Sequence, residues 1–508
     1  MSHARAIMVL GTASHVGKSL ITTALCRIFA QRGYRVAPFK SQNMSLNSAA
    51  TIEGLEIGRA QALQAEAAGV PPSVHMNPIL IKPSGDCSSQ VVVRGKIWGQ
   101  ISAADYHQRR VEELMPIVRE SYHTLASQFE VIVLEGAGSP AEINLSQHDI
   151  VNMRMAEMAD APCLLVGDID RGGVFASLLG TVELLDSRER ARIRGFCINK
   201  FRGDLSLLEP GVRMMEQRLG KSCLGVIPYL PDLALEEEDS VGLPAIARTS
   251  WAASGQTPNR PLRIAVIALP SFSNFTDFDS LRAEPSVELL FSSSADLLAH
   301  ADVVILPGSK ETVTDLQWLL KRGFERALRI QPGLIVGICG GMQMLGEQIT
   351  DPAGVERSGC APGLGLLPIQ TTMQTAKVTR LSSGNICGAS LFGQPIREQC
   401  IAGYEIHIGR TTYLDGAEPF ATLTHGELDG CVSLDRRVLG TYLHGIFDDD
   451  SFRHQFLIAA RSFHHLAPPS VLIPWQSQRK DSLDRLARHV SASLDMRQIF
   501  SWAGLDYA

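Results

Sequence analysis

One stretch, residues 334–345, constrains the fold of this chain more than any other. Apolar residues rich in β-branched side chains lead to Cys339, and a helical pattern follows directly. Gly337 stands two residues before the cysteine, and Gly340 and Gly341 follow it. This is the pattern of a nucleophile elbow, a sharp strand-to-helix turn that presents a reactive side chain. The neighbours must be small because the backbone turns too tightly for larger side chains.

The elbow predicts that Cys339 is a catalytic nucleophile. A helix that begins at the cysteine places free N–H groups and its positive end beside the sulfur, which favours the thiolate. The alternative is a structural cysteine in a glycine-rich turn, since free cysteines are among the most buried residues. We favour the nucleophile because features described below support it.

Length and composition restrict the class of protein. A chain of 508 residues predicts two or three domains, and 45% hydrophobic with 20% charged residues is ordinary for a globular protein. The net charge of −6 and the lack of a basic cluster argue against nucleic acid as a partner. No apolar run reaches membrane-spanning length, so we expect no membrane partner. Ten scattered cysteines without CxxC pairs indicate a reduced, cytoplasmic protein.

A second motif stands at the start of the chain. A short apolar strand leads into the loop 11–19, and a helical pattern covers 20–32. This strand–loop–helix order is that of a P-loop, whose backbone N–H groups bind phosphates. Lys18 would then reach the outer phosphates of ATP, and the hydroxyl of Ser19 would bind Mg²⁺.

The loop departs from the standard P-loop spacing, because Thr12 stands where the first glycine is usual, although Gly17 keeps its place. A glycine-rich strand-to-helix turn with a chance Lys-Ser is the alternative. The variant pattern resembles the P-loop of the dethiobiotin synthetase type, which implies binding of ATP through Thr12, Gly17, Lys18 and Ser19.

A buried carboxylate is expected near this loop. The apolar strand 131–134 leads to Glu135, and a carboxylate at that place is a suitable Mg²⁺ ligand beside a phosphate site. An exposed loop glutamate is the alternative. A second metal carboxylate is less defined: Asp168 and Asp170 are candidates, but they could equally hold the loop 171–173.

Several polar residues at expected strand ends suggest a substrate site, because α/β sheets bind ligands at the carboxyl ends of their strands. Lys40 could stabilise a transferring phosphoryl group, and Gln42 and Asn43 follow it in an amide-rich loop; a helix-capping loop is the alternative. Lys82 is another candidate cation. Asn199, at a later strand end, could read the nucleotide base or cap a helix.

The alternation of strands and helices predicts parallel sheets with helices on both faces, and hence an α/β fold. We expect a doubly wound P-loop domain over residues 1–240, a linker over 241–260, a second α/β domain over 261–460 and a helical tail over 461–508.

The second half resembles a class I glutamine amidotransferase domain, on the strand 301–306 with its Pro-Gly-Ser end and on the Cys339 elbow. The resemblance implies an oxyanion hole at Gly308, Ser309 and the N–H of Gly340. It also implies that Cys339 attacks the side-chain amide of L-glutamine and releases ammonia.

This chemistry requires a histidine. His444, after the elbow in chain order, fits the resemblance, and His407 competes with it. The family's usual acid two residues after the histidine is absent, since Ile446 stands there. Either another group orients His444 or the site is a Cys–His dyad, and Asp448 stands at a different offset.

Taken together, the two halves resemble the cobyrinic acid amidating enzymes. The segments that carry this resemblance are 39–45, 57–62, 75–78, 168–175, 273–278, 403–407 and 442–445. It implies that ATP, Mg²⁺ and glutamine are used to amidate carboxylates b, d, e and g of (adenosyl)cobyrinic acid a,c-diamide, a corrinoid. The alternatives are the sister enzyme that makes the a,c-diamide, a non-catalytic P-loop regulator with an inactive amidotransferase-like module, and an enzyme that amidates another polycarboxylate, such as a cell-wall precursor.

Overall fold

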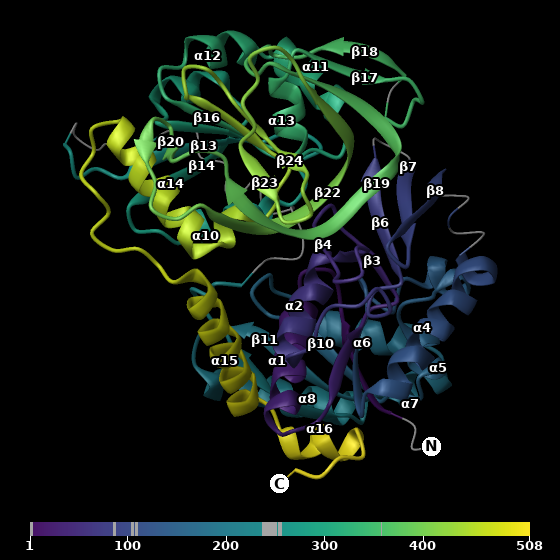
Figure 1. Ribbon diagram of the computed structural model, residues 1–508. Coiled ribbons are helices and arrows are strands. Elements are labelled where there is room, and N and C mark those ends of the chain that lie inside the picture. Colours follow the sequence, from purple (N-terminus) through teal and green to yellow (C-terminus); the bar gives the residue numbers. More distant parts are fainter. Residues whose placement is uncertain are drawn as a thin grey trace. The chain divides into compact units, whose positions relative to one another are not determined.

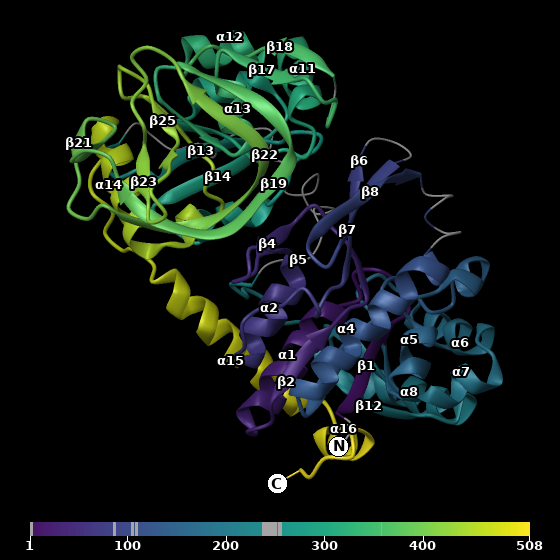
Figure 2. The same ribbon diagram turned by 45° about the vertical axis from the view of Figure 1, so that its right-hand side comes forward.

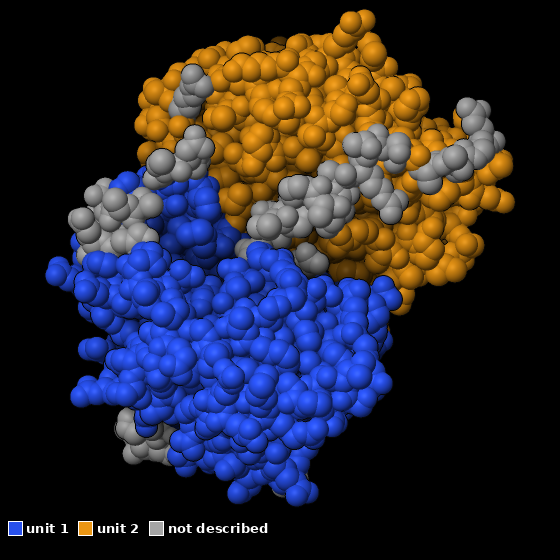
Figure 3. Space-filling model, turned by 180° about the vertical axis from the view of Figure 1, so that it is seen from behind, with its two compact units in different colours: residues 1–45, 56–238, 479–508 blue, residues 46–55, 239–478 orange. Residues whose placement is uncertain are grey.

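The computed structural model describes residues 4–84, 88–102, 106, 110–235, 251, 257–356 and 358–507 (Figure 1). The chain forms two compact units, coloured separately in Figure 3. Unit 1 comprises Met1–Ser45, Glu56–Glu238 and Arg479–Ala508, and unit 2 comprises Leu46–Leu55 and Asp239–Gln478.

These units differ in two places from the contiguous domains expected from the sequence. A ten-residue piece of the N-terminal half belongs to unit 2, and the end of the C-terminal tail belongs to unit 1. Most of the expected linker, 241–260, lies outside the described residues.

Unit 1 begins with alternating strands and helices, as expected. Its elements are β1 (Arg5–Gly11), α1 (Lys18–Gln31), β2 (Val36–Phe39), β3 (Gln42–Met44), β5 (Glu56–Gly58), α2 (Arg59–Ala68), β6 (Ile79–Ser84), β7 (Ser88–Val93), β8 (Lys96–Ser102), η1 (Arg110–Leu114), α4 (Met115–Gln128), β9 (Val131–Glu135), η2 (Ile143–His148), α5 (Met153–Met158), β10 (Cys163–Asp168), α6 (Val174–Leu184), α7 (Ser187–Arg192), β11 (Ile193–Phe201), α8 (Leu205–Leu219) and β12 (Ser222–Pro228).

The main sheet of unit 1 has the order β12-β11-β10-β1-β9-β2, and all neighbouring strands are parallel. Its inner strands are buried on both faces, which explains their continuous apolar runs. The chain leaves β1 toward β9 and β2 on one side and returns to β10 on the other. The carboxyl end of β1 therefore lies at a topological switch point, where such sheets bind ligands. A second, four-stranded sheet has the order β3-β6-β7-β8.

The end of the chain completes the core of unit 1. The helices α15 (Trp475–Ser493) and α16 (Met496–Trp502), yellow in Figures 1 and 2, pack beside α1. The rings of Phe29 and Phe500 lie 4.8 Å apart, and Nε of Arg27 donates to Asp484 at 2.8 Å. The amphipathic pattern expected over 483–494 thus buries its apolar face in this core.

Unit 2 contains β4 (Ser48–Ala50) and most of the second half of the chain. Its other elements are β13 (Leu262–Ile267), η4 (Phe275–Phe278), α10 (Asp279–Arg282), β14 (Val287–Ser292), η5 (Ala295–His300), β15 (Val303–Leu306), α11 (Thr312–Lys321), α12 (Phe324–Ile330), β16 (Leu334–Ile338), α13 (Gly340–Leu345), β17 (Gln348–Asp351), β18 (Gly359–Pro362), β19 (Ile369–Ile386), β20 (Ser390–Leu391), β21 (Gln394–Pro395), β22 (Cys400–Tyr413), β23 (Ala421–Leu423), β24 (Leu428–Asp429), β25 (Cys431–Val432), β26 (Val438–Thr441), η6 (Ile446–Asp448) and α14 (Asp450–Phe463).

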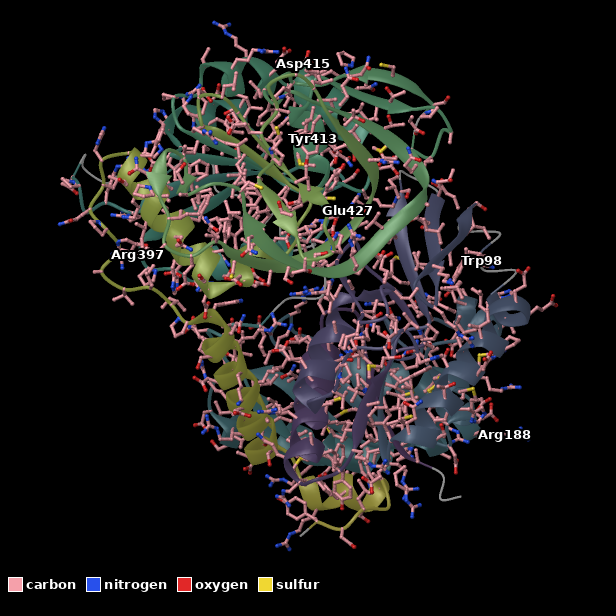
Figure 4. All side chains as sticks on the ribbon, viewed as in Figure 1. Trp98, Arg188, Arg397, Tyr413, Asp415 and Glu427 are labelled. Atoms are coloured by element: carbon pink, nitrogen blue, oxygen red, sulfur yellow. The ribbon has the colours of Figure 1, made fainter. Side chains whose placement is uncertain are left out.

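Two six-stranded sheets make up most of unit 2. One has the order β14-β13-β15-β16-β26-β25 and is parallel except at β25. The other is built on the long antiparallel pair β19 and β22, the curved ribbons of Figure 2. At the end of β22, Tyr413, labelled in Figure 4, donates its hydroxyl hydrogen to the carbonyl oxygen of Gly430 at 2.9 Å. The α/β fold expected for both halves is confirmed.

Candidate functional sites

The P-loop lies between β1 and α1 in unit 1. Gly17 has φ +100°, and a Cβ there would overlap the side-chain amide of Asn199, so the position requires glycine. The Lys18 ammonium donates to the carbonyl oxygens of Ala13 at 2.8 Å and Gly138 at 3.0 Å. The ammonium of Lys18 is therefore held against the backbone of the loop, at the N-terminus of α1. This is the arrangement that binds phosphate groups.

Glu135 is the buried centre of this site. Its carboxylate is 1% exposed and accepts hydrogen bonds from Ser19 Oγ at 2.8 Å, Lys40 Nζ at 2.9 Å and Gln64 Nε2 at 2.6 Å. The alternative of an exposed loop glutamate is therefore wrong. Sequence reasoning did not select Gln64, whose helix α2 is brought to the carboxylate only by packing.

The oxygens at this site suit Mg²⁺. A serine hydroxyl and a carboxylate are hard donors, and they lie within hydrogen-bond distance of each other. Within the described ranges, no group of three or more His, Cys, Asp and Glu side chains is arranged to hold a metal ion. A magnesium ion here would thus complete its coordination with nucleotide phosphates and water, as is usual for this ion.

Asp168 and Asn199 support the P-loop from the neighbouring strands. Asp168 accepts from Lys200 Nζ at 2.8 Å, and the same ammonium donates to the carbonyl oxygen of His15 at 2.6 Å. Asn199 donates its side-chain amide to the carbonyl oxygen of Val16 at 2.9 Å. Asp168 also accepts from the backbone N–H of Asp170 at 2.8 Å, directly before the loop 171–173.

The expected substrate loop is not a loop throughout, because Gln42–Met44 form the strand β3 beside β6, and most of it is buried in unit 1. Lys40 pairs with Glu135, whereas Gln42 accepts from the hydroxyl of Tyr106 at 2.6 Å. Asn43 donates to Gln61 Oε1 at 3.1 Å. These contacts bring Lys40 to the carboxylate beside the P-loop.

Another expected cation, Lys82, forms a buried ion pair with Glu56. This pairing offsets the charge of Lys82, as Glu135 offsets that of Lys40, but only the carboxylate paired with Lys40 also contacts the P-loop residue Ser19.

The elbow in unit 2 has the strained backbone that the sequence pattern predicts. Cys339 has φ 52° and ψ −110°, outside the regions that L residues favour. A Cβ on Gly341 would overlap the carbonyl oxygen of Leu306, and one on Gly337 would overlap Leu345. The N–H of Cys339 donates to the carbonyl oxygen of Thr441 at 2.8 Å, which fixes the turn against β26.

The imidazole of His444 lies between Cys339 and Asp277 and forms a hydrogen bond with each. Nδ1 of His444 is 2.7 Å from Oδ2 of Asp277, and the N–H of Gly445 donates to Oδ1 at 2.9 Å. Since Nδ1 contacts the carboxylate, Nε2 is the nitrogen left for its hydrogen bond to the cysteine. Burial disfavours a charged imidazole, but the charges of Asp277 and Cys339 outweigh it and raise the pKa of His444 to about 10.

Asp277 is therefore the acid that orients His444, in place of the family's usual residue at the position of Ile446. Sequence reasoning missed this role. Asp277 stands in the segment 273–278, which the sequence links to the site only through its resemblance to the cobyrinic acid amidating enzymes. A carboxylate from a different segment produces no local spacing that a motif could reveal.

The competing histidine, His407, has a different environment. Its ring stacks on Tyr442 with centroids 3.8 Å apart, and its nitrogens lie 2.8 Å from the Gly409 carbonyl oxygen and 3.4 Å from Glu405. Burial disfavours the Glu405 carboxylate, but hydrogen bonds from His407 and other partners lower its pKa to about 2. His407 thus belongs to a charged network on β22.

The expected oxyanion residues meet at the elbow. Gly340 is the first residue of α13, so its N–H has no partner within that helix. A Cβ on Gly340 would lie 2.9 Å from the backbone nitrogen of Ser309. Gly308 accepts from the N–H of Ser273 at 3.0 Å, and Ser309 Oγ donates to Asp315 at 2.6 Å, which hold this loop in place. The two backbone N–H groups can therefore serve one oxygen atom beside Cys339.

Comparisons with known proteins agree with these two sites. A family model described as "CobQ/CobB/MinD/ParA nucleotide binding domain" matches residues 7–241. Another, described as "CobB/CobQ-like glutamine amidotransferase domain", matches residues 263–452. The fold and sites thus define a nucleotide-binding domain joined to a glutamine amidotransferase domain.

Curated relatives match nearly the whole chain. A cobyric acid synthase of Moorella thermoacetica is 48% identical over 99% of this chain and 98% of its own length. One of Sorangium cellulosum is 49% identical over 98% and 99% of the two chains, and one of Thermoanaerobacter sp. is 48% identical over 97% and 98%. This chain belongs to the cobyric acid synthase family. No helix within the described ranges has the length and apolar character needed to span a bilayer.

Proposed function

We propose that this protein amidates carboxylates b, d, e and g of (adenosyl)cobyrinic acid a,c-diamide to give cobyric acid, with ATP, Mg²⁺ and glutamine. Full-length similarity to cobyric acid synthases is the observation that carries the proposal. The Cys339–His444–Asp277 geometry supports the glutaminase step and argues against an inactive amidotransferase-like module.

In unit 2, the Cys339 sulfur attacks the side-chain amide carbon of glutamine. The N–H groups of Ser309 and Gly340 stabilise the oxyanion, and Gly308 shapes the loop. His444 gives its proton to the leaving nitrogen, which departs as ammonia and leaves a glutamyl thioester. Water then attacks the thioester while His444 accepts a proton, and glutamate and the free cysteine are restored.

In unit 1, ATP activates a carboxylate, which is otherwise a poor electrophile. A carboxylate oxygen of the corrinoid attacks the γ-phosphorus, and ADP leaves. Lys18 and Lys40 offset the charge that develops on the transferring group, while Thr12 and Gly17 shape the phosphate loop. Ammonia displaces phosphate from the acyl phosphate and forms the amide. Magnesium, held by Ser19 and Glu135, would neutralise phosphate charge.

The remaining roles follow from position. Gln42 and Asn43 are proposed to contact the corrinoid, because they continue the chain from Lys40. Asn199 is proposed to face the nucleotide, because its side chain holds the P-loop at Val16. We also propose a cytoplasmic location, since the nine free cysteines of the described residues are typical of a reducing compartment.

Mass spectrometry of the reaction on the a,c-diamide tests this proposal. We expect four successive losses of about one mass unit, as OH is replaced by NH₂, with both ATP and glutamine required. Cys339→Ala should abolish the reaction with glutamine and retain it with ammonia. Amidation of cobyrinic acid but not of the diamide would assign the sister activity, and no reaction with any corrinoid would overturn the proposal.

A further inference from the structure

A short segment of the N-terminal half, residues 46–55, belongs to unit 2. It follows directly after the loop that carries Lys40, Gln42 and Asn43. We refer to it as the crossing segment. Its contacts with the residues around the glutaminase site lie within unit 2.

Two asparagines bind the crossing segment to the turn before Asp277. Oδ1 of Asn47 accepts from the backbone N–H of Phe275 at 3.2 Å, and Oδ1 of Asn274 accepts from the backbone N–H of Ser48 at 2.9 Å. The side chains are reciprocal, since each accepts from the backbone of the other segment. Asn47, Ser48 and Asn274 are 2%, 0% and 3% exposed, so water does not compete for these bonds.

Asn274 determines the path of the turn that carries Asp277. It has φ 55° and ψ 45°, in the left-handed region that asparagine tolerates better than most residues. Its carbonyl oxygen accepts from the N–H of Asp277 at 3.0 Å. A shift of Asn274 would therefore move the carboxylate that contacts His444.

The crossing segment also touches the other side of the site. Ala50 packs in a small buried cluster with Tyr404 and Ile406. The Tyr404 ring stacks on His444 with centroids 5.4 Å apart, and the Ile406 carbonyl oxygen lies 3.6 Å from Cys339 Sγ. One segment thus contacts the residues that border each member of the triad.

We propose that Asn47 and Asn274 are positioning residues of the glutaminase site, and that the crossing segment couples glutamine hydrolysis to the synthase loop from which it extends. The inference rests on the proposed function. The physical reason is covalent continuity: a displacement of residues 40–45, which include β3, on substrate binding is passed to Asn47 and then to the turn holding Asp277.

Glutaminase kinetics of the full-length protein test the positioning role. Asn274→Gly keeps the left-handed backbone accessible but removes the oxygen that accepts from the Ser48 N–H. Asn47→Ala removes the oxygen that accepts from the Phe275 N–H. We expect kcat for glutamine hydrolysis to fall about 10- to 100-fold in each, with little change in KM, because the imidazole is misplaced rather than the substrate. The pH profile should also shift, since His444 loses part of its carboxylate support.

Three comparisons separate positioning from general destabilisation. Asn47→Asp keeps an acceptor oxygen and should restore most of the rate. Asn274→Gly should keep ammonia-dependent amidation of the diamide at the wild-type rate. Asn385→Ala, on β19 in the same unit, should leave glutaminase kcat unchanged. A wild-type kcat in Asn274→Gly, or an equal loss in Asn385→Ala, would overturn the positioning role.

The coupling is tested by adding ATP and the diamide. We expect them to raise the glutaminase rate of the wild type, and the ratio of stimulated to basal rates to fall toward one in Asn47→Ala. A wild type without stimulation, or an unchanged ratio in the variant, would overturn the coupling. A wild type that hydrolyses no glutamine would overturn the proposed function as well, whereas an active wild type with unaffected asparagine variants would overturn this inference alone.

Discussion

Oδ2 of Asp277 lies 2.7 Å from Nδ1 of His444, although 167 positions separate the two residues in the sequence. The contact completes a Cys–His–Asp arrangement whose acid comes from the turn after β13 and not from the segment after the histidine. Asp277 is only 2% exposed, so water does not compete with its hydrogen bond to the imidazole.

Asp277→Asn tests this contact. The amide has nearly the same shape but lacks the charge that helps to raise the pKa of His444, so glutaminase kcat should fall about 10³- to 10⁴-fold. Ammonia-dependent amidation should be unchanged. Steady-state assays with each nitrogen source measure both, and Asp435→Asn, an exposed carboxylate bound to Arg437, is the matched control. A fall of less than about tenfold would contradict the assigned role.

The same pair makes stability depend on pH. The pKa of His444 is raised from 6.5 to about 10, so the folded state binds a proton that the unfolded state releases in this window. The stabilisation is complete below pH 6.5 and is lost as pH rises through about 10. The difference in free energy of unfolding between wild type and Asp277→Asn should therefore shrink over this range. Chemical denaturation at a series of pH values measures it, and a difference independent of pH would refute it.

Glu135→Gln should weaken the synthase site without affecting unit 2. The amide keeps the size of the side chain but loses the charge that would bind Mg²⁺ and that pairs with Lys40. We expect ATP-dependent amidation to need about 10- to 100-fold more Mg²⁺, while basal glutaminase activity is retained. Titration of the rate with Mg²⁺ measures this, with Glu130→Gln as the control at an exposed site. Unchanged Mg²⁺ dependence would limit Glu135 to holding Lys40.

Arg453 and Glu284 form a fully buried ion pair in unit 2, with Nε 2.8 Å from Oε1. Arg453→Met removes the guanidinium that balances the glutamate charge and should lower the free energy of unfolding by about 3–5 kcal/mol. Combining it with Glu284→Leu removes both charges and should restore most of the loss. Denaturation of the single and double variants measures this, and an equal loss in both would show that packing, not charge, is responsible.

The site residues that could be predicted from the sequence are those that lie in local motifs. Lys18 and Ser19 lie in one continuous strand–loop–helix unit, and Cys339 lies in another, so the backbone alone places them. The strand that ends at Glu135 was recognised for the same reason. In each case, residues close in sequence determine the geometry.

Contacts between distant segments could not be predicted in this way. Asp277 reaches His444, and Gln64 reaches Glu135, only because separate elements pack together. The amphipathic pattern over 483–494 predicts a buried face but does not indicate which core receives it. Likewise, the polar residues around Asn47 suggest a loop and contain no sign that they belong to unit 2.

The return of the chain's end to unit 1 has a consequence for biosynthesis. The core around α1 includes Ile499 and Phe500. On a ribosome, where chains emerge at about 5–20 residues per second, residues 1–238 are made long before these side chains. While the glutaminase unit is synthesised, the core of the nucleotide-binding unit still lacks the side chains of α15 and α16, and part of its apolar surface stays uncovered. The nucleotide-binding unit, most of which is made before the glutaminase unit, is thus completed after it, and its nascent form exposes the kind of apolar surface that promotes aggregation.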